Sequence, residues 1–178
     1  IQEAGRVGLK LNYPLAENFV QFSYLVPHRK GEAVPADKAL AIVEKLNTAV
    51  RDTIRYGWSM FYPFTRPEIS PRFMTDRAVD GGDTEFLQTS LYEGGQTNHG
   101  DFWRISLDGR ASILRNLHED GYRTPANVPE GQKWLDPWVQ VRDVTEIVRH
   151  SRGYPYEFSD VTAMCFQLAW KGWKSRGF

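Results

Sequence analysis

Basic and aromatic residues alternate closely at the C-terminal end of the chain. The sequence there reads "LAWKGWKSRGF", and no acidic residue follows Asp160. Aromatic rings can stack on nucleic-acid bases while neighbouring cations neutralise the phosphates. Alternatively, the two tryptophans are ordinary strand residues, and the lysines only protect a sheet edge from aggregation. The first interpretation predicts a nucleic-acid contact made by Trp170, Lys171, Trp173, Lys174 and Arg176.

Two further arginines belong to a predicted β-hairpin and could extend this basic surface. The stretch "DFWRISLDGRASILRN" alternates on both sides of Asp108-Gly109, a pair that favours a two-residue type I′ turn. Such a turn places Arg104 and Arg115 on the same face of the hairpin. We therefore expect both guanidinium groups to contribute to nucleic-acid binding.

The aromatic stretch "YGWSMFYPFTRP" offers a second kind of site. Pockets for small molecules or peptides combine apolar walls with a few placed polar groups. Here an arginine would bind an anionic group between aromatic walls, which would make the chain a sensor. Alternatively, the stretch closes the core and buries its tryptophan and phenylalanines, so that only a tyrosine and the arginine reach solvent. The residues in question are Trp58, Phe61, Tyr62, Phe64 and Arg66.

The sequence contains few groups arranged for catalysis. Its histidines stand in no HExxH or other paired ligand spacing. No GxSxG elbow, P-loop or dinucleotide fingerprint occurs. A hydrolase would need His99, His118 and a carboxylate such as Glu119 to converge in one cleft, and this is a third alternative. We expect a non-enzymatic protein with no catalytic residue, no metal and no cofactor.

Cysteine usage and hydropathy indicate the compartment. Cys165 lies within the apolar run "AMCFQLAW", which predicts a buried, inert thiol, and a single cysteine cannot form an internal disulfide. No apolar run approaches the roughly 18 residues needed to span a bilayer, and no signal peptide is recognisable. These features predict a cytoplasmic protein without a membrane partner. Because a predicted strand begins almost at Ile1, we expect a fragment of a longer protein.

Two helices are predicted from apolar residues at steps of three and four. The first spans about 35–56, and the second about 136–153, where Asp136 is the expected N-cap before Pro137. The expected inward stripe of the second helix is Val139, Val144, Ile147 and Val148.

Strands are predicted where residues alternate or favour extended backbone. They cover about 7–12, 19–26, 84–92, 102–116 (the hairpin above) and 161–173. Helices and strands in this order predict an α+β fold, a mainly antiparallel sheet of hairpins packed against two helices. We expect one domain over 1–178, with a minor subdomain boundary in the Gly- and Asp-rich stretch near 76–83.

The overall charge gives no general support for nucleic-acid binding. Lys+Arg and Asp+Glu both total 22, so the formal net charge is zero, whereas nucleic-acid binders usually carry an excess of basic residues. A neutral total can still contain a local basic patch. Whether the chain binds nucleic acid therefore depends on local basic patches of its surface rather than on its total charge.

Three segments carry a resemblance to a known group of proteins: "FTRPEISP", "DFWRISLDGRAS" and "CFQLAWKGWKSR". Together they resemble the C-terminal region of bacterial proteins that carry a Schlafen-like, AlbA-type DNA-binding domain at their N-terminus. The resemblance implies a cytoplasmic regulatory or defence-related protein whose DNA-binding module lies upstream of Ile1. The present chain would then be an accessory domain for sensing, homo-oligomer formation or additional nucleic-acid contact.

Overall fold

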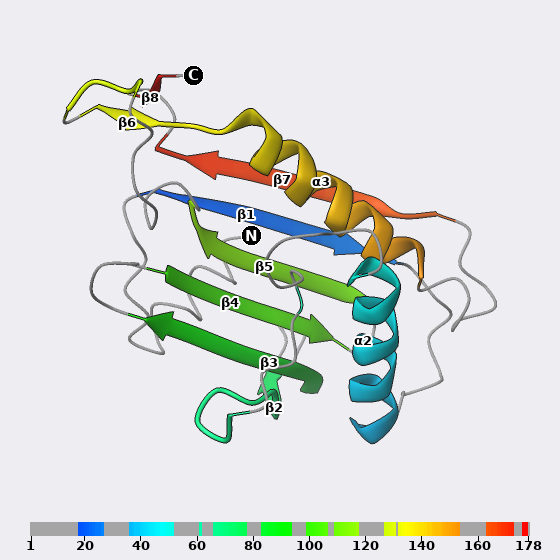
Figure 1. Ribbon diagram of the computed structural model, residues 1–178. Helices are drawn as coiled ribbons and strands as arrows, with labels where there is room; N and C mark the ends of the chain where they lie inside the picture. The colour runs from blue at the N-terminus through cyan, green and yellow to red at the C-terminus, as the bar shows by residue number, and fades with distance from the viewer. Residues whose placement is uncertain are drawn as a thin grey trace.

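The computed structural model gives the chain the predicted α+β architecture (Figure 1). Its described part contains one antiparallel six-stranded sheet, two helices and a separate pair of two-residue strands. The described residues are 18–26, 36–51, 61, 66–77, 83–93, 99–106, 109–117, 127–130, 132–153, 163–172 and 176–177. The predicted strand over 7–12 lies outside these ranges.

The strands of the large sheet follow the order β2-β3-β4-β5-β1-β7, whereas β6 and β8 pair in parallel. Consecutive strands from β2 to β5 are neighbours, and β1 lies between β5 and β7. The predictions did not include β2, β6 or β8. The elements are β1 Phe19–Leu25, α2 Ala36–Arg51, β2 Arg72–Arg77, β3 Asp83–Glu93, β4 His99–Ser106, β5 Arg110–Asn116, β6 Lys133–Trp134, α3 Pro137–Arg152, β7 Cys165–Lys171 and β8 Arg176–Gly177.

One face of the sheet and both helices form the hydrophobic core. Val20 and Phe22 on β1 and Trp103 on β4 belong to the same buried cluster as Val43 of α2 and Ile147 of α3. Alternate residues of a strand point to opposite faces, so the strand registers define which side chains lie toward the helices. We call this side the helix-covered face. Both predicted helices are thereby confirmed as the second layer of the fold.

The β4–β5 hairpin forms where predicted, but its register differs by one residue. Three residues, 107–109, separate β4 from β5, and Gly109 has a φ of 88°. A three-residue hairpin loop commonly needs a left-handed glycine at this position. Trp103 therefore pairs with Ile113, and Arg104 with Ser112. The prediction that Arg104 and Arg115 share a face is wrong, because a shift of one residue reverses the faces.

One further prediction needs correction. Cys165 is exposed, not buried, because it begins β7 opposite the exposed Leu25 on the side away from the helices. Residues 76 and 77, at the start of the Gly- and Asp-rich stretch, belong to β2 and pair with β3. The subdomain boundary near 76–83 stays a prediction.

Candidate interaction surface on helix α3

Helix α3 begins where the sequence predicts but buries a different set of residues. Asp136 caps it, accepting a hydrogen bond from the backbone N–H of Trp138 at 2.9 Å. Val148 of the predicted inward stripe is 37 % exposed, so its prediction as a core residue is wrong. Most of the buried residues are polar: Gln140, Asp143, Glu146, Ile147, His150 and Ser151.

A buried ion pair on the sheet explains why polar residues of α3 face inward. Asp101 on β4 and Arg115 on β5 are directly opposite each other on the helix-covered face. Arg115 donates through Nε to Asp101 Oδ1 at 2.5 Å and through Nη2 to Oδ2 at 3.4 Å. Both side chains are buried. Charges removed from water in this way need close partners, and unpaired charges would cost several kcal/mol.

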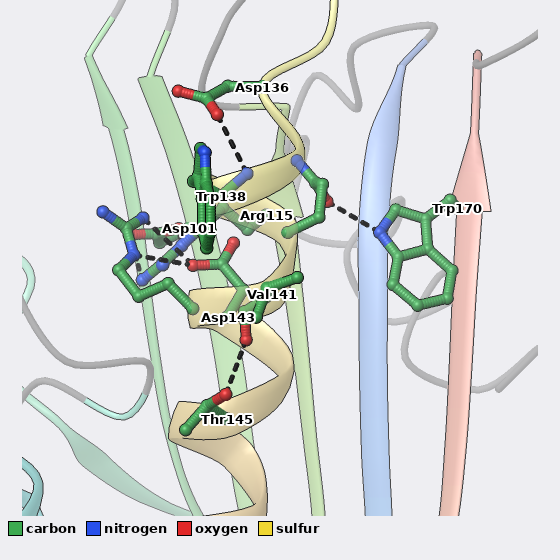
Figure 2. Close-up of polar contacts among 10 residues, drawn as sticks. Asp101, Arg115, Asp136, Trp138, Val141, Asp143, Thr145 and Trp170 are labelled. Atoms are coloured by element: carbon green, nitrogen blue, oxygen red, sulfur yellow. Dashed lines mark hydrogen bonds and ion pairs between the residues drawn. The ribbon is translucent and has the colours of Figure 1, made fainter. Parts of the chain in front are cut away.

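Asp143 and Glu146 of α3 act on this pair electrostatically, and Figure 2 shows Asp143 on the helix together with Asp101 and Arg115 of the sheet. Burial alone would lower the pKa of Arg115, but Asp101, Asp143 and Glu146 raise it above its ordinary value. Burial raises the pKa of Asp143, while Arg115 and Arg142 act in the opposite direction. Arg142 holds the Asp143 carboxylate from the solvent side, at 3.0 Å from Nη2 to Oδ1. Arg115 thus interacts electrostatically with acids of both the sheet and the helix.

Hydrogen bonds extend this contact toward both ends of α3. Trp170 on β7 donates through Nε1 to Gln140 Oε1 at 2.8 Å. Near the other end, His150 Nδ1 lies 3.1 Å from the Tyr24 hydroxyl, and its ring lies 4.4 Å from that of Phe61. Burial lowers the pKa of His150 to about 3, so this imidazole is neutral at neutral pH. We refer to these contacts and the ion cluster together as the polar seam.

The polar seam has a structural role in the arrangement observed. Most of its side chains are buried, and they contact one another within the sheet and across the helix–sheet interface. Among the described residues, no group of three or more His, Cys, Asp or Glu is arranged to hold a metal ion. The opposite side of α3, in contrast, carries side chains that a partner can reach.

The outward side of α3 is apolar and basic. Trp138 is 80 % exposed and Val141 57 % exposed, and together with Val148 they follow one side of the helix at steps of three and seven. Arg149 and Arg152 are exposed in the last turns, and Arg142 is partly exposed. Both acids of the helix face inward. This outward face, defined as Trp138, Val141, Arg142, Val148, Arg149 and Arg152, carries an exposed indole near its N-terminal end and arginines toward its C-terminal end.

The residues predicted to bind nucleic acid do not form one surface. Arg115 is buried in its ion pair, and Arg176 is buried and donates to the carbonyl oxygens of Gly172 and Trp134. Arg104, on the opposite face of the sheet from Arg115, stacks over the Phe86 ring at 3.5 Å. None of these guanidinium groups therefore projects freely into solvent.

The C-terminal set divides in a similar way. Trp170 is half-buried, meets Phe22 edge-on with ring centroids 5.4 Å apart, and uses its indole N–H within the polar seam. Lys171 is exposed, with Nζ 5.6 Å from the Phe19 ring centroid. Trp173 and Lys174 lie outside the described residues.

Of the five candidate ligand-binding residues in the aromatic stretch, the structure describes two. Phe61 is fully buried, packs edge-on against Tyr24 and Trp103, and accepts a hydrogen bond at its carbonyl oxygen from the Asn47 side chain. It is a core residue, as the alternative interpretation expects. Arg66 is exposed. The pocket stays a prediction for Trp58, Tyr62 and Phe64, which the structure does not describe.

The side chains of the hydrolase alternative lie outside the described residues. His99 lies in β4, but its side chain is outside the described part, as are His118 and Glu119.

The outward face of α3 was not predicted from the sequence. The available signal was that Trp138, Val141 and Val148 fall on one side of the helix while Asp143 and Glu146 fall on the other.

Comparisons with known proteins identify no relative: no family model, no curated protein and no solved structure matches the chain. Neither helix in the described part is long and apolar enough to cross a membrane.

Proposed function

We propose that this chain is a non-enzymatic accessory domain that contacts nucleic acid through the outward face of α3. The observation that carries the proposal is an 80 % exposed Trp138 on a helix whose arginines face outward and whose acids are buried. The bacterial, cytoplasmic regulator in which such a domain would act is suggested by the sequence resemblance.

The chemistry of this surface fits an anionic polymer that carries flat rings. Arginine binds phosphate through paired N–H donors and keeps its charge at any physiological pH. An exposed indole can stack on an unpaired base, which contributes about 1–3 kcal/mol per base. Since no carboxylate of α3 faces outward, phosphates would meet little repulsion from this helix.

Salt dependence is the signature that separates this mode of binding from apolar docking. Each neutralised phosphate releases counterions, so the affinity falls with salt at a logarithmic slope of about −0.7 per contact for single strands and −0.9 for duplex. Contacts by Arg149 and Arg152 would give a slope of about −1.4 to −1.8. The slope thereby counts the arginines that contact phosphate.

The proposal is tested by fluorescence anisotropy with labelled single-stranded and duplex DNA and RNA at 50 and 200 mM salt. Arg149→Glu with Arg152→Glu should weaken binding at least tenfold. Lys38→Glu with Arg72→Glu changes the net charge equally at exposed positions on other elements and should change the affinity less than twofold. Absence of binding at 50 mM salt, or equal losses in both double variants, would refute the proposal.

A further inference from the structure

The exposed indole and the exposed arginines of α3 lie on one side of the helix but far apart along it. An α-helix completes a turn in about 3.6 residues and rises about 1.5 Å per residue. Arg149 therefore lies about three turns, or about 16 Å, beyond Trp138, and Arg152 lies about 21 Å beyond it. All three side chains are exposed. A ligand that contacts both the indole and the arginines must be extended and lie along the helix.

The surface between these two groups is largely neutral. Trp138, Val141 and Thr145 follow one another along α3 in Figure 2. Thr145 is exposed, and its hydroxyl donates to the carbonyl oxygen of Val141 at 2.7 Å. The charge of Arg142 is balanced by Asp143, at 3.0 Å from Nη2 to Oδ1. The outward face thus has one end suited to a flat ring and another suited to anions.

The charges at the two ends of α3 favour an anion at one end only. The Asp136 carboxylate lies beside Trp138, whose backbone N–H it accepts at 2.9 Å, and it would repel a phosphate placed there. At the other end, the helix carbonyls amount to about half a negative charge. Two full positive charges, on Arg149 and Arg152, exceed this. Phosphates are therefore favoured near the C-terminal end and a neutral base near the N-terminal end.

We infer that the outward face binds one single nucleic-acid strand lengthwise, with a base stacked on Trp138 and phosphates at Arg149 and Arg152. The inference rests on the proposed nucleic-acid contact and adds the class of substrate. A single strand offers a free ring face at every base, whereas a duplex hides its bases within the stack except at its ends. At about 3.4 Å per stacked nucleotide, the separation of the two groups corresponds to about five or six nucleotides.

Strand length provides the first measurement. Anisotropy titrations at 50 mM salt would compare labelled single strands of two to twelve nucleotides. The affinity should rise at least fivefold between three and six nucleotides, because only the longer strand reaches the indole and the arginines together. Beyond six nucleotides it should rise only in proportion to the number of possible registers. Arg149→Glu with Arg152→Glu should abolish the rise.

Removal of the bases separates the two ends of the site. A strand of six abasic sugar-phosphates keeps the anions but offers no ring. Trp138→Ser should weaken binding of the normal six-nucleotide strand about fivefold or more and change that of the abasic strand less than twofold. Trp138→Phe retains a ring and should restore most of the affinity. A duplex closed at both ends by base-free linkers should be insensitive to Trp138→Ser.

This inference and the proposed function fail in different ways. If neither single strands nor duplexes bind at 50 mM salt, the nucleic-acid contact itself is refuted, and the lengthwise arrangement with it. The lengthwise arrangement alone is refuted if strands bind with an affinity that does not change between three and six nucleotides. It is also refuted if Trp138→Ser weakens the abasic strand or the closed duplex as much as the normal strand.

Discussion

The two sides of α3 differ in polarity in the opposite sense to most surface helices. The inward side holds Asp143, Glu146 and His150, whereas the outward side presents Trp138 and Val141 to solvent. In a typical surface helix the apolar stripe faces the core. Here the acids of the helix lie toward the ion pair on the sheet, and the apolar residues on the outward side are available for a partner.

This difference indicates that charge, as well as burial, sets the rotation of α3 about its axis. Only one rotation brings Asp143 and Glu146 toward Arg115 while Ile147 enters the core. Buried ion pairs often add little to stability relative to apolar replacements of equal shape. We therefore expect the polar seam to specify the docking of the helix, and the outward face to matter for binding alone.

The largest effect should follow from removing the cation of the polar seam. Arg115→Met removes the cation that is paired with the buried Asp101 and that interacts with Asp143 and Glu146, and it should lower the free energy of unfolding by about 3–5 kcal/mol. Urea denaturation measures the loss. Arg104→Met, on the other face of the hairpin, should cost about 1 kcal/mol or less, because that guanidinium is only partly buried over Phe86. A loss below 1 kcal/mol for Arg115→Met would contradict the assigned role of the seam.

The next effect is a loss of stability in acid caused by His150. Its pKa is about 3 in the folded protein against an ordinary 6.5, so its contribution is complete above pH 6.5 and is lost as the pH falls toward 3. Below pH 6, the native protein should lose about 1.4 kcal/mol per pH unit relative to His150→Gln. Urea unfolding of both proteins between pH 4.5 and 7.5 measures this difference.

Asp143 acts with the opposite sign over an overlapping range. Its pKa is raised in the folded protein, so its contribution is complete below the ordinary value of 3.8 and diminishes as the pH rises through the folded pKa. The comparison with His150→Gln isolates the histidine, because Asp143 is present in both proteins. Parallel stability curves for the two proteins would show that His150 is not held neutral by burial.

A moderate effect is expected at the Gln140–Trp170 hydrogen bond. Gln140→Leu keeps similar volume but leaves the indole N–H of Trp170 without this acceptor, which should cost about 1–2 kcal/mol. Chemical denaturation measures the cost. Val141→Leu, one position along on the outward side, should leave stability unchanged within about 0.5 kcal/mol. Equal effects at both positions would remove the distinction between the two sides of α3.

The smallest effect on stability should come from replacing Trp138. The same replacement is the sharpest test of the proposed nucleic-acid contact. Trp138→Ser removes an indole that is 80 % exposed and should change the free energy of unfolding by less than about 0.5 kcal/mol. Affinity for single-stranded nucleic acid should fall by about 1–3 kcal/mol if the ring stacks on one base. Anisotropy titrations measure this loss, and an unchanged affinity would exclude Trp138 from the contact.

Much of the fold follows from local sequence pattern. The alternation in β1, the apolar run of β7 and the Asp136 cap of α3 each indicate an element that the structure contains. The hairpin register was not predictable in the same way, because Asp108-Gly109 suits a two-residue turn and a glycine also suits a longer loop. One additional loop residue was enough to reverse the faces of Arg104 and Arg115.

The candidate surface was harder to predict because α3 carries two plausible inward stripes. One stripe is apolar and is the one that the sequence pattern predicts to face inward: Val139, Val144, Ile147 and Val148. The other stripe is polar, and it is expected to face inward only when a buried cation lies opposite its acids. That cation, Arg115, lies on a strand whose register the sequence left open. The position of the Arg115 guanidinium in the folded protein therefore decided which side of α3 faces solvent.

The position of β1 in the sheet also affects when this protein can fold during its synthesis. Ser23, near the middle of β1, pairs with Ser112 on β5 and with Gln167 on β7. Neither neighbour exists when β1 leaves the ribosome, and the last one is made more than a hundred residues later. Because such distant pairing is slow, β1 meets its first neighbour only once β5 has been made, and its second strand partner follows only with β7.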